Sequence, residues 1–230
     1  MTGLTPADLA AIGLSLKVAA TAMLLSLPVA FSVALLLARS RFPGRSLLDA
    51  AVHLPLVLPP VATGYVLLIL LGRNGPLGRP LAEIGVVFAF DWTGAALAAA
   101  VMAFPLMVRA IRLAIEAIDP EVEEVARTLG ARPLLRLLRV TLPLAAPGLI
   151  AGAVLGFAKA LGEFGATITF AAAIPGATLT LPTAIYQAVQ QPGSEGRALT
   201  LCAVATVIAV AAVIAANAFG RAVERPTGRG

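Results

Sequence analysis

The chain is poor in charge, cysteine, histidine and aromatic residues. Charged residues make up 13% of the 230 positions and aromatic residues 5%. A single cysteine excludes an internal disulfide, and with a single histidine the chain lacks the clustered ligands of a metal site. It also lacks a glycine-rich phosphate loop of the Walker type, so we expect it to bind no ATP by itself.

Apolar residues take their place, and they come in long runs. Hydrophobic residues make up 59% of the chain, and the mean hydropathy is +0.94. Val18 to Ala38 is a run of 21 residues without a charge, and Ala198 to Gly220 is one of 23. Either run is long enough to cross about 30 Å of hydrocarbon as a helix. Alanine, glycine and leucine dominate, and small residues let helices approach closely in lipid. The sequence therefore predicts an all-α membrane protein.

The other expected spans are less regular. The second, from about 51 to 71, contains three prolines, so its unpaired carbonyls should face protein or water rather than lipid. The third runs from about 93 to 108 and the fourth from about 142 to 158. The segment 159–191 is apolar but interrupted by glycine and proline, which predicts an irregular or re-entrant segment. We expect about five transmembrane helices in a single domain, 1–230, with its core at about 10–220.

The positions of the basic residues predict an orientation. The loop near residue 40, the loop near residue 125 and the C-terminal tail carry twelve arginines, whereas the intervening connections carry three. Basic residues that flank a membrane are in excess on the cytoplasmic side. We therefore expect both loops and the C-terminus inside and the N-terminus outside, a parity that five spans satisfy.

A polar loop at about 113–142 has the signals of two short helices. Asp119 is a good N-cap, and Pro120 at the first helical position loses no hydrogen bond. Gly130 should end this helix, and a second should begin after Pro133. Acidic residues suit the first turns: Glu121, Glu123 and Glu124. Such a loop favours docking of a partner protein, and the alternative is a helix pair that lies on the lipid headgroups.

The same loop resembles a known signature. Glu124-Val125-Ala126, three residues, Gly130, nine residues and Val140-Thr141-Leu142-Pro143 are similar to the "EAA" motif of bacterial ABC importer permeases, which has Ala and Ile where this chain has Val125 and Val140. The resemblance implies a type I importer permease fold and a coupling helix that fits a cleft on a separate ATPase. It assigns coupling to seven residues: Glu121, Glu124, Ala126, Gly130, Ala131, Leu142 and Pro143.

Three further stretches resemble molybdate importer permeases of the ModB type, over about 10–220. They are His53 to Pro60 with Thr63-Gly64-Tyr65, Phe104 to Arg112, and Leu161 to Phe170 with Ile174 to Thr178 and Thr180 to Pro182. Sulfate permeases share a looser version. Many ModB-type chains carry glutamate where this one has Ala177. The resemblance implies the translocation subunit of an ATP-driven molybdate importer, with tungstate and sulfate or thiosulfate as alternative substrates. A secondary transporter is disfavoured because we see no convincing internal repeat.

The resemblance also implies a set of partners. They are a second copy of the chain, two ABC ATPase subunits that bind ATP and Mg, and a periplasmic or lipid-anchored molybdate-binding protein, which supplies most of the selectivity. The chain itself would be a non-catalytic, multi-pass subunit of the bacterial inner membrane, embedded in the lipid bilayer, that binds no cofactor, metal or nucleic acid.

A path for a doubly charged oxyanion should offer neutral donors rather than a tight cationic site, because the anion must also leave. The candidate neutral groups are Thr63, Tyr65, Thr167 and Thr169, with Thr178 and Thr180 beside them. Lys159 and Glu163 are four residues apart and could pair on one helix face. Two readings remain open: a structural pair, in which Glu163 also bonds backbone at a broken helix, or a Lys159 that attracts the anion.

Overall fold

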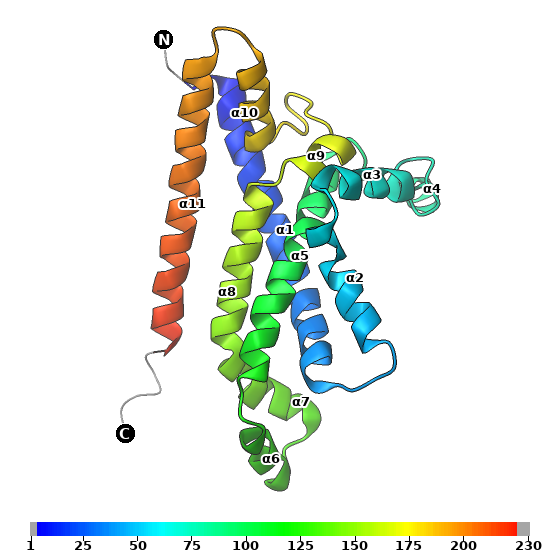
Figure 1. Cartoon of the computed structure of the whole chain (residues 1–230), viewed down its shortest axis with the longest axis vertical. Coiled ribbons are helices and arrows are strands. Elements are labelled where there is room, and N and C mark those ends of the chain that lie inside the picture. The colour runs from blue at the N-terminus through cyan, green and yellow to red at the C-terminus, as the bar shows by residue number, and fades with distance from the viewer. Residues whose placement is uncertain (1–3, 225–230) are drawn as a thin grey trace.

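The computed structural model describes residues 4–224, with side chains to residue 215, and every regular element in this range is helical (Figure 1). Four of the helices in this range, counting Pro133–Leu161 as one, are long and apolar enough to cross a membrane, or five if one bent pair is counted. This confirms the expected all-α membrane class, with four to five candidate spans where about five were expected. The long helices run along the molecule as α1 (Pro6–Arg39), α5 (Trp92–Glu116), α8 (Leu142–Leu161) and α11 (Glu195–Glu224).

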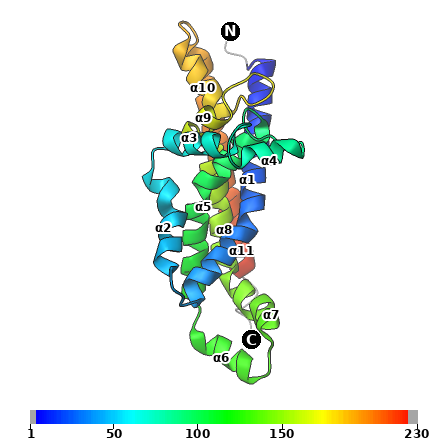
Figure 2. The ribbon, with the colours of Figure 1, turned by 90° about the vertical axis from the view of Figure 1, so that its right-hand side faces the viewer.

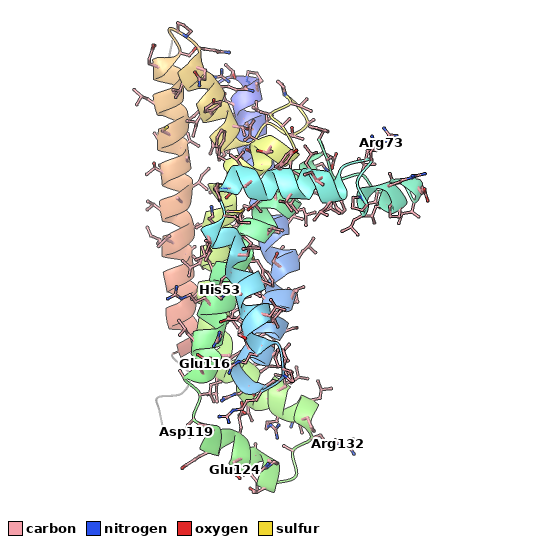
Figure 3. The ribbon with its side chains drawn as sticks, turned by 45° about the vertical axis from the view of Figure 1, so that its right-hand side comes forward. His53, Arg73, Glu116, Asp119, Glu124 and Arg132 are labelled. Atoms are coloured by element: carbon pink, nitrogen blue, oxygen red, sulfur yellow. The ribbon has the colours of Figure 1, made fainter. Side chains whose placement is uncertain are left out.

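The bent pair corrects the expected second span. Instead of one helix over 51–71, the chain forms α2 (Arg45–Val57) and α3 (Pro60–Leu71), whose axes differ by 115°. A residue before proline is pushed out of the helical region, and Leu58, before Pro59, is extended with ψ 143°. The α3 helix therefore runs across the bundle and leads outward to α4 (Gly78–Glu83), as Figure 3 shows.

Two other helices extend beyond the expected spans. The α1 helix starts at Pro6 rather than near residue 18, because Thr5 and Asp8 form a capping box at its N-terminus. The α5 helix continues to Glu116 rather than ending near 108. Its last turns carry Arg112, which bonds Glu116 at 2.7 Å and Asp49 of α2 at 3.0 Å. This pairing of Arg112 lets the helix continue past the expected end of the span.

Small residues bring two of the long helices, α5 and α8, close together. Three glycines at four-residue intervals, Gly148, Gly152 and Gly156, place one face of α8 against α5. A Cβ at Gly156 would lie 2.6 Å from Met107 Sδ, and one at Gly148 would clash with Ala114 Cβ. Close backbone approach of this kind allows helices to associate in lipid, where no hydrophobic effect drives them together.

The segment 159–191 is irregular, as expected. It contains α9 (Gly165–Phe170) and α10 (Leu181–Gln190), joined by a loop. The α9 helix crosses α3 with almost no space between the backbones, since a Cβ at Gly64 would lie 2.5 Å from Ala166 O. The α10 helix lies beside α11 at the end of the molecule where α1 begins (Figures 1 and 2).

A buried ion pair joins the first and last long helices. The Asp8 carboxylate, 0% exposed, accepts hydrogen bonds from Arg197 at 2.6 Å and 3.0 Å. Close by, the Ser15 hydroxyl accepts a hydrogen bond of 2.6 Å from the Leu181 N–H of α10. These bonds hold α1, α10 and α11 together at one end of the bundle.

The opposite end gathers the basic loops. The turn after α1, the loop between α5 and α8, and the C-terminal end of α11 all lie there (Figures 1 and 2). This arrangement has the parity expected from the arginine asymmetry, although Arg225 and Arg229 lie outside the described residues. Which end faces the cytoplasm stays a prediction.

Candidate functional site

The loop between α5 and α8 contains the helix expected from its sequence. This helix, α6 (Pro120–Thr128), begins where the Asp119 carboxylate accepts a hydrogen bond of 2.9 Å from the Glu121 N–H. Glu121 and Glu123 lie in the first turn, where the helix dipole favours acids. Local signals therefore fix where the helix begins.

Gly130 ends α6 as predicted. Its φ is +83°, and its N–H bonds the Arg127 carbonyl at 3.0 Å while the Ala131 N–H bonds the Ala126 carbonyl at 3.1 Å. These two bonds make a Schellman motif, which reverses the chain after a helix. Ala126, Gly130 and Ala131 of the expected coupling set thus shape the turn.

The second helix of the loop differs from the expectation of a separate element. It begins as α7 (Pro133–Arg136), widens into the π-helical stretch η1 (Leu137–Thr141) and runs into α8 without a break. The Leu142 N–H bonds the Leu137 carbonyl, five residues back. Pro143 lacks an N–H and crowds the preceding turn, which the wider π turn accommodates. Leu142 and Pro143 are therefore the first residues of α8.

The loop between α5 and α8 exposes several apolar side chains. Leu129, at the tip, is 82% exposed, and α6 contains no buried residue. Figure 3 shows Asp119, Glu124 and Arg132 at this protruding end. The exposed apolar residues are Val122, Val125, Leu129, Leu134, Leu135 and Leu138. A protruding apolar surface of this kind marks a protein or membrane interaction site.

Two neighbouring glutamates of α6 have different surroundings. Glu124, from the expected coupling set, is exposed and pairs within its own helix with Arg127 at 2.8 Å. Glu123 instead points back to the bundle, where it bonds Arg39 of α1 at 3.3 Å and Thr141 of η1 at 3.0 Å. Sequence reasoning did not assign a role to Glu123, Arg39 or Thr141. The only sequence signal for Glu123 was its place in an acidic first turn.

The predicted pair of Lys159 and Glu163 forms where α8 ends. The Lys159 ammonium lies 2.6 Å from a Glu163 carboxylate oxygen, and the Glu163 side chain is 2% exposed. The other carboxylate oxygen accepts a hydrogen bond of 3.1 Å from the Ala166 N–H at the start of α9. This geometry is the one expected if the pair is structural, with the Glu163 carboxylate joining the end of α8 to the start of α9.

The neutral path candidates separate into buried and exposed groups. Thr63 of α3 and Thr167 of α9 are both buried on the two helices that cross at Gly64. The Thr63 hydroxyl has no hydrogen-bond partner in the described part of the chain. Tyr65 is 57% exposed, and Thr169 bonds the Gly165 carbonyl of its own helix at 2.9 Å. The structure therefore brings Thr63 and Thr167 to one crossing and leaves Tyr65 on the surface.

The two threonines named beside them lie in the loop after α9 and at the start of α10. Thr178 accepts a hydrogen bond of 3.0 Å from the Ile174 N–H, and Thr180 caps the start of α10 together with Thr183. Both are buried. Their hydroxyls therefore shape the loop between α9 and α10. Among residues 4–224, no three histidine, cysteine or acidic side chains gather closely enough to hold a metal ion.

A helical bundle with a protruding helical loop is the architecture of an importer's membrane subunit, and the sequence places the chain in that class. Residues 13–227 match the family described as the binding-protein-dependent transport system inner membrane component, and the chain belongs to it. The chain is 51% identical over 227 residues to the molybdenum transport system permease protein ModB of Escherichia coli (strain K12), covering 98% of this chain and 99% of that protein.

Other relatives give the same picture. The protein of the same name from Haemophilus influenzae is 49% identical over 224 residues, covering 97% of this chain and 98% of that protein. A more distant relative is the sulfate transport system permease protein CysT of Salmonella typhimurium, 37% identical over 194 residues, covering 83% of this chain and 70% of that protein. The resemblance expected from the sequence is thereby confirmed.

A solved structure confirms the fold. A bacterial ABC transporter involved in the import of the acidic polysaccharide alginate superposes with a TM-score of 0.78 at 21% sequence identity. The match covers 96% of this chain and 82% of the other. The chain therefore has the fold of an ABC importer permease.

Proposed function

We propose that this chain is the permease subunit of an ATP-driven molybdate importer and forms the oxyanion path across the bacterial inner membrane. The observation that carries the proposal is its 51% identity, over nearly its whole length, to a molybdenum transport permease. The sulfate permease relative is more distant, at 37%. Tungstate and sulfate or thiosulfate remain the alternative substrates.

The working complex would contain other chains. Two copies of this chain would enclose the path, two ABC ATPase subunits would bind ATP and Mg, and a periplasmic or lipid-anchored binding protein would deliver molybdate. The family description, with its binding-protein dependence, supports the last of these. The chain itself would be a non-catalytic subunit, with no cofactor of its own.

The loop around α6 would dock the ATPase, with the N-terminus outside and the C-terminus inside. Its exposed apolar residues and the absence of buried residues in α6 support a surface that a partner covers. The arginine-rich turn after α1 at the same end supports the cytoplasmic side. Closure of the ATPases on ATP would draw the two loops together and open the path outward.

Reconstitution tests the function. Vesicles that contain this chain, its ATPase and the binding protein should accumulate molybdate only with ATP, and tungstate should compete more strongly than sulfate. Uptake driven by an ion gradient without the ATPase would contradict the proposal and favour a secondary transporter. Stronger competition by sulfate than by tungstate would contradict the molybdate assignment.

The role of the Lys159–Glu163 pair has its own test. Lys159→Gln leaves the nearly buried Glu163 carboxylate without its counter-charge, so molybdate uptake should fall roughly tenfold or more. The double variant Lys159→Gln/Glu163→Gln should recover most uptake, because a glutamine oxygen still accepts from the Ala166 N–H. The uptake rates of both variants distinguish a structural pair from an anion-attracting lysine. Equal loss of uptake in the two would mean that the Lys159 charge itself attracts the anion.

A further inference from the structure

Three segments of the chain meet at one polar cluster near the protruding loop. Arg39 is the last residue of α1, Glu123 belongs to α6, and Thr141 closes η1. The Glu123 carboxylate accepts hydrogen bonds from Arg39 at 3.3 Å and from Thr141 at 3.0 Å through the same oxygen. Arg39 also donates to the Ile118 carbonyl at 3.3 Å, just before α6 begins.

Apolar packing does not hold α6 to the bundle. The helix has no buried residue, and its apolar side chains Val122 and Val125 are 44% and 57% exposed. A cavity of about 560 Å³ separates the end of α1 from α7, with Arg39, Glu123 and Thr141 on its wall. Among the side-chain hydrogen bonds in the described part of the chain, those to Glu123 are the ones that join α6 to α1 and η1.

The surroundings of these groups strengthen that connection. Thr141 is buried at 3% exposure, and the side chains of Arg39 and Glu123 are 26% and 19% exposed. Water screens such partly buried charges less than it screens a surface pair. The exposed Glu124–Arg127 pair, with side chains 64% and 66% exposed, lies within one helix and connects nothing else.

Thr141 lies where the backbone departs from α-helical geometry. Thr141 is the last residue of the π-helical stretch, which joins the loop to α8. Single π turns inside longer helices often mark functional sites. If the chain through η1 were the only connection, we would expect a movement of α6 to bend the backbone at η1 instead of moving α8. The hydrogen bonds of Glu123 supply a second connection.

We propose that Arg39, Glu123 and Thr141 form a latch that makes α6 move as one body with α1 and α8. The three are positioning residues. They contact neither ATP nor oxyanion, and they convert displacement of the loop into displacement of two membrane helices. This inference rests on the proposed docking of an ATPase on α6.

The main test is Glu123→Gln in the complete complex of permease, ATPase and binding protein. The glutamine keeps the size of the side chain but removes the charge that holds Arg39. We expect molybdate uptake per ATP hydrolysed to fall about tenfold, because coupling residues remote from both ligands modulate coupling on this scale. Co-purification of the ATPase and the melting temperature of the complex should match the wild type, which a merely structural residue would not allow.

Thr141 provides a matched pair of variants. Thr141→Val keeps the shape of the buried side chain and loses the hydroxyl, whereas Thr141→Ser keeps the donor to Glu123. We expect the valine variant to lose coupling and the serine variant to retain it. Asp49→Asn is the control, because Asp49 joins α2 to α5 through Arg112 at 3.0 Å without touching α6. It should transport with the wild-type ratio.

A wild-type ratio of uptake to ATP hydrolysis in Glu123→Gln would overturn the latch, and so would equal ratios in the serine and valine variants. A loss of ATPase co-purification or of melting temperature that parallels the loss of uptake would also overturn it, since the residue would then be structural. A wild-type complex without ATP-dependent uptake would instead overturn the proposed function, and the latch with it.

Discussion

Replacing Gly130 by valine is expected to abolish ATP-driven molybdate uptake while the protein still inserts into the membrane. Gly130 has φ +83°, a conformation that costs an L-residue about 1–2 kcal/mol and a β-branched residue most of all. The turn would rebuild, and the bonds from Gly130 and Ala131 to the end of α6 would be lost. The apolar surface of α6 would then no longer be held in the orientation that the proposed docking of the ATPase requires.

Uptake and ATPase binding, measured in the same membranes, test this expectation. Gly193→Val is the matched control, because Gly193 has φ +80°, has nothing within 4 Å of its Cβ position, and lies between α10 and α11 at the other end of the molecule. It carries the same backbone strain away from the docking loop and should transport normally. Wild-type uptake by Gly130→Val would contradict the docking role of this loop.

Replacing Gly148 by leucine is expected to destabilise the bundle and to lower the yield of folded protein. A Cβ at this position already clashes with Ala114 Cβ and would lie 3.1 Å from the Ala110 carbonyl oxygen, which belongs to the backbone. A leucine must therefore force α5 and α8 apart. Overpacking typically costs about 1–3 kcal/mol, and a rigid helix contact leaves little room for relaxation. The yield of folded protein should fall severalfold or more.

The comparison uses Gly13→Leu, since Gly13 lies in α1 with nothing within 4 Å of its Cβ position. Both substitutions add the same apolar side chain to a long apolar helix, so hydropathy and insertion propensity change alike. Yield from membranes and the melting temperature in detergent should drop only for Gly148→Leu. Equal yields and melting temperatures for the two would refute tight packing between α5 and α8.

Much of the fold follows from charge and apolar runs, which mark the long helices well. The break between α2 and α3 was missed as a change of direction, although the three prolines were seen. Hydropathy carries no information on the direction of a helix axis, so an apolar run of this length is equally compatible with one straight helix and with two helices joined at a bend. The early start of α1 was missed because it depends on the cap formed by Thr5 and Asp8, which lies well before the uncharged run that begins at Val18.

In the candidate site, features that depend on residues close together in the sequence were predictable, and features that depend on distant residues were not. The α6 helix and its glycine turn were predictable because their N-cap, acidic first turn and C-terminal glycine lie within a dozen residues. The pair of Lys159 and Glu163 was predictable from its spacing of four. The latch was not, since Arg39 and Glu123 are 84 residues apart and only the packed bundle brings them together.

The buried pair of Asp8 and Arg197 has a consequence for biosynthesis. Asp8 leaves the ribosome 189 residues ahead of its partner, yet in the finished protein it is completely buried. An unpaired carboxylate is too costly to bury in a membrane protein, so the nascent chain must keep Asp8 in water until the last helix emerges. Translation that stops before α11 would therefore leave the Asp8 carboxylate without Arg197, so the N-terminal end of α1 could not pack as it does in the complete chain.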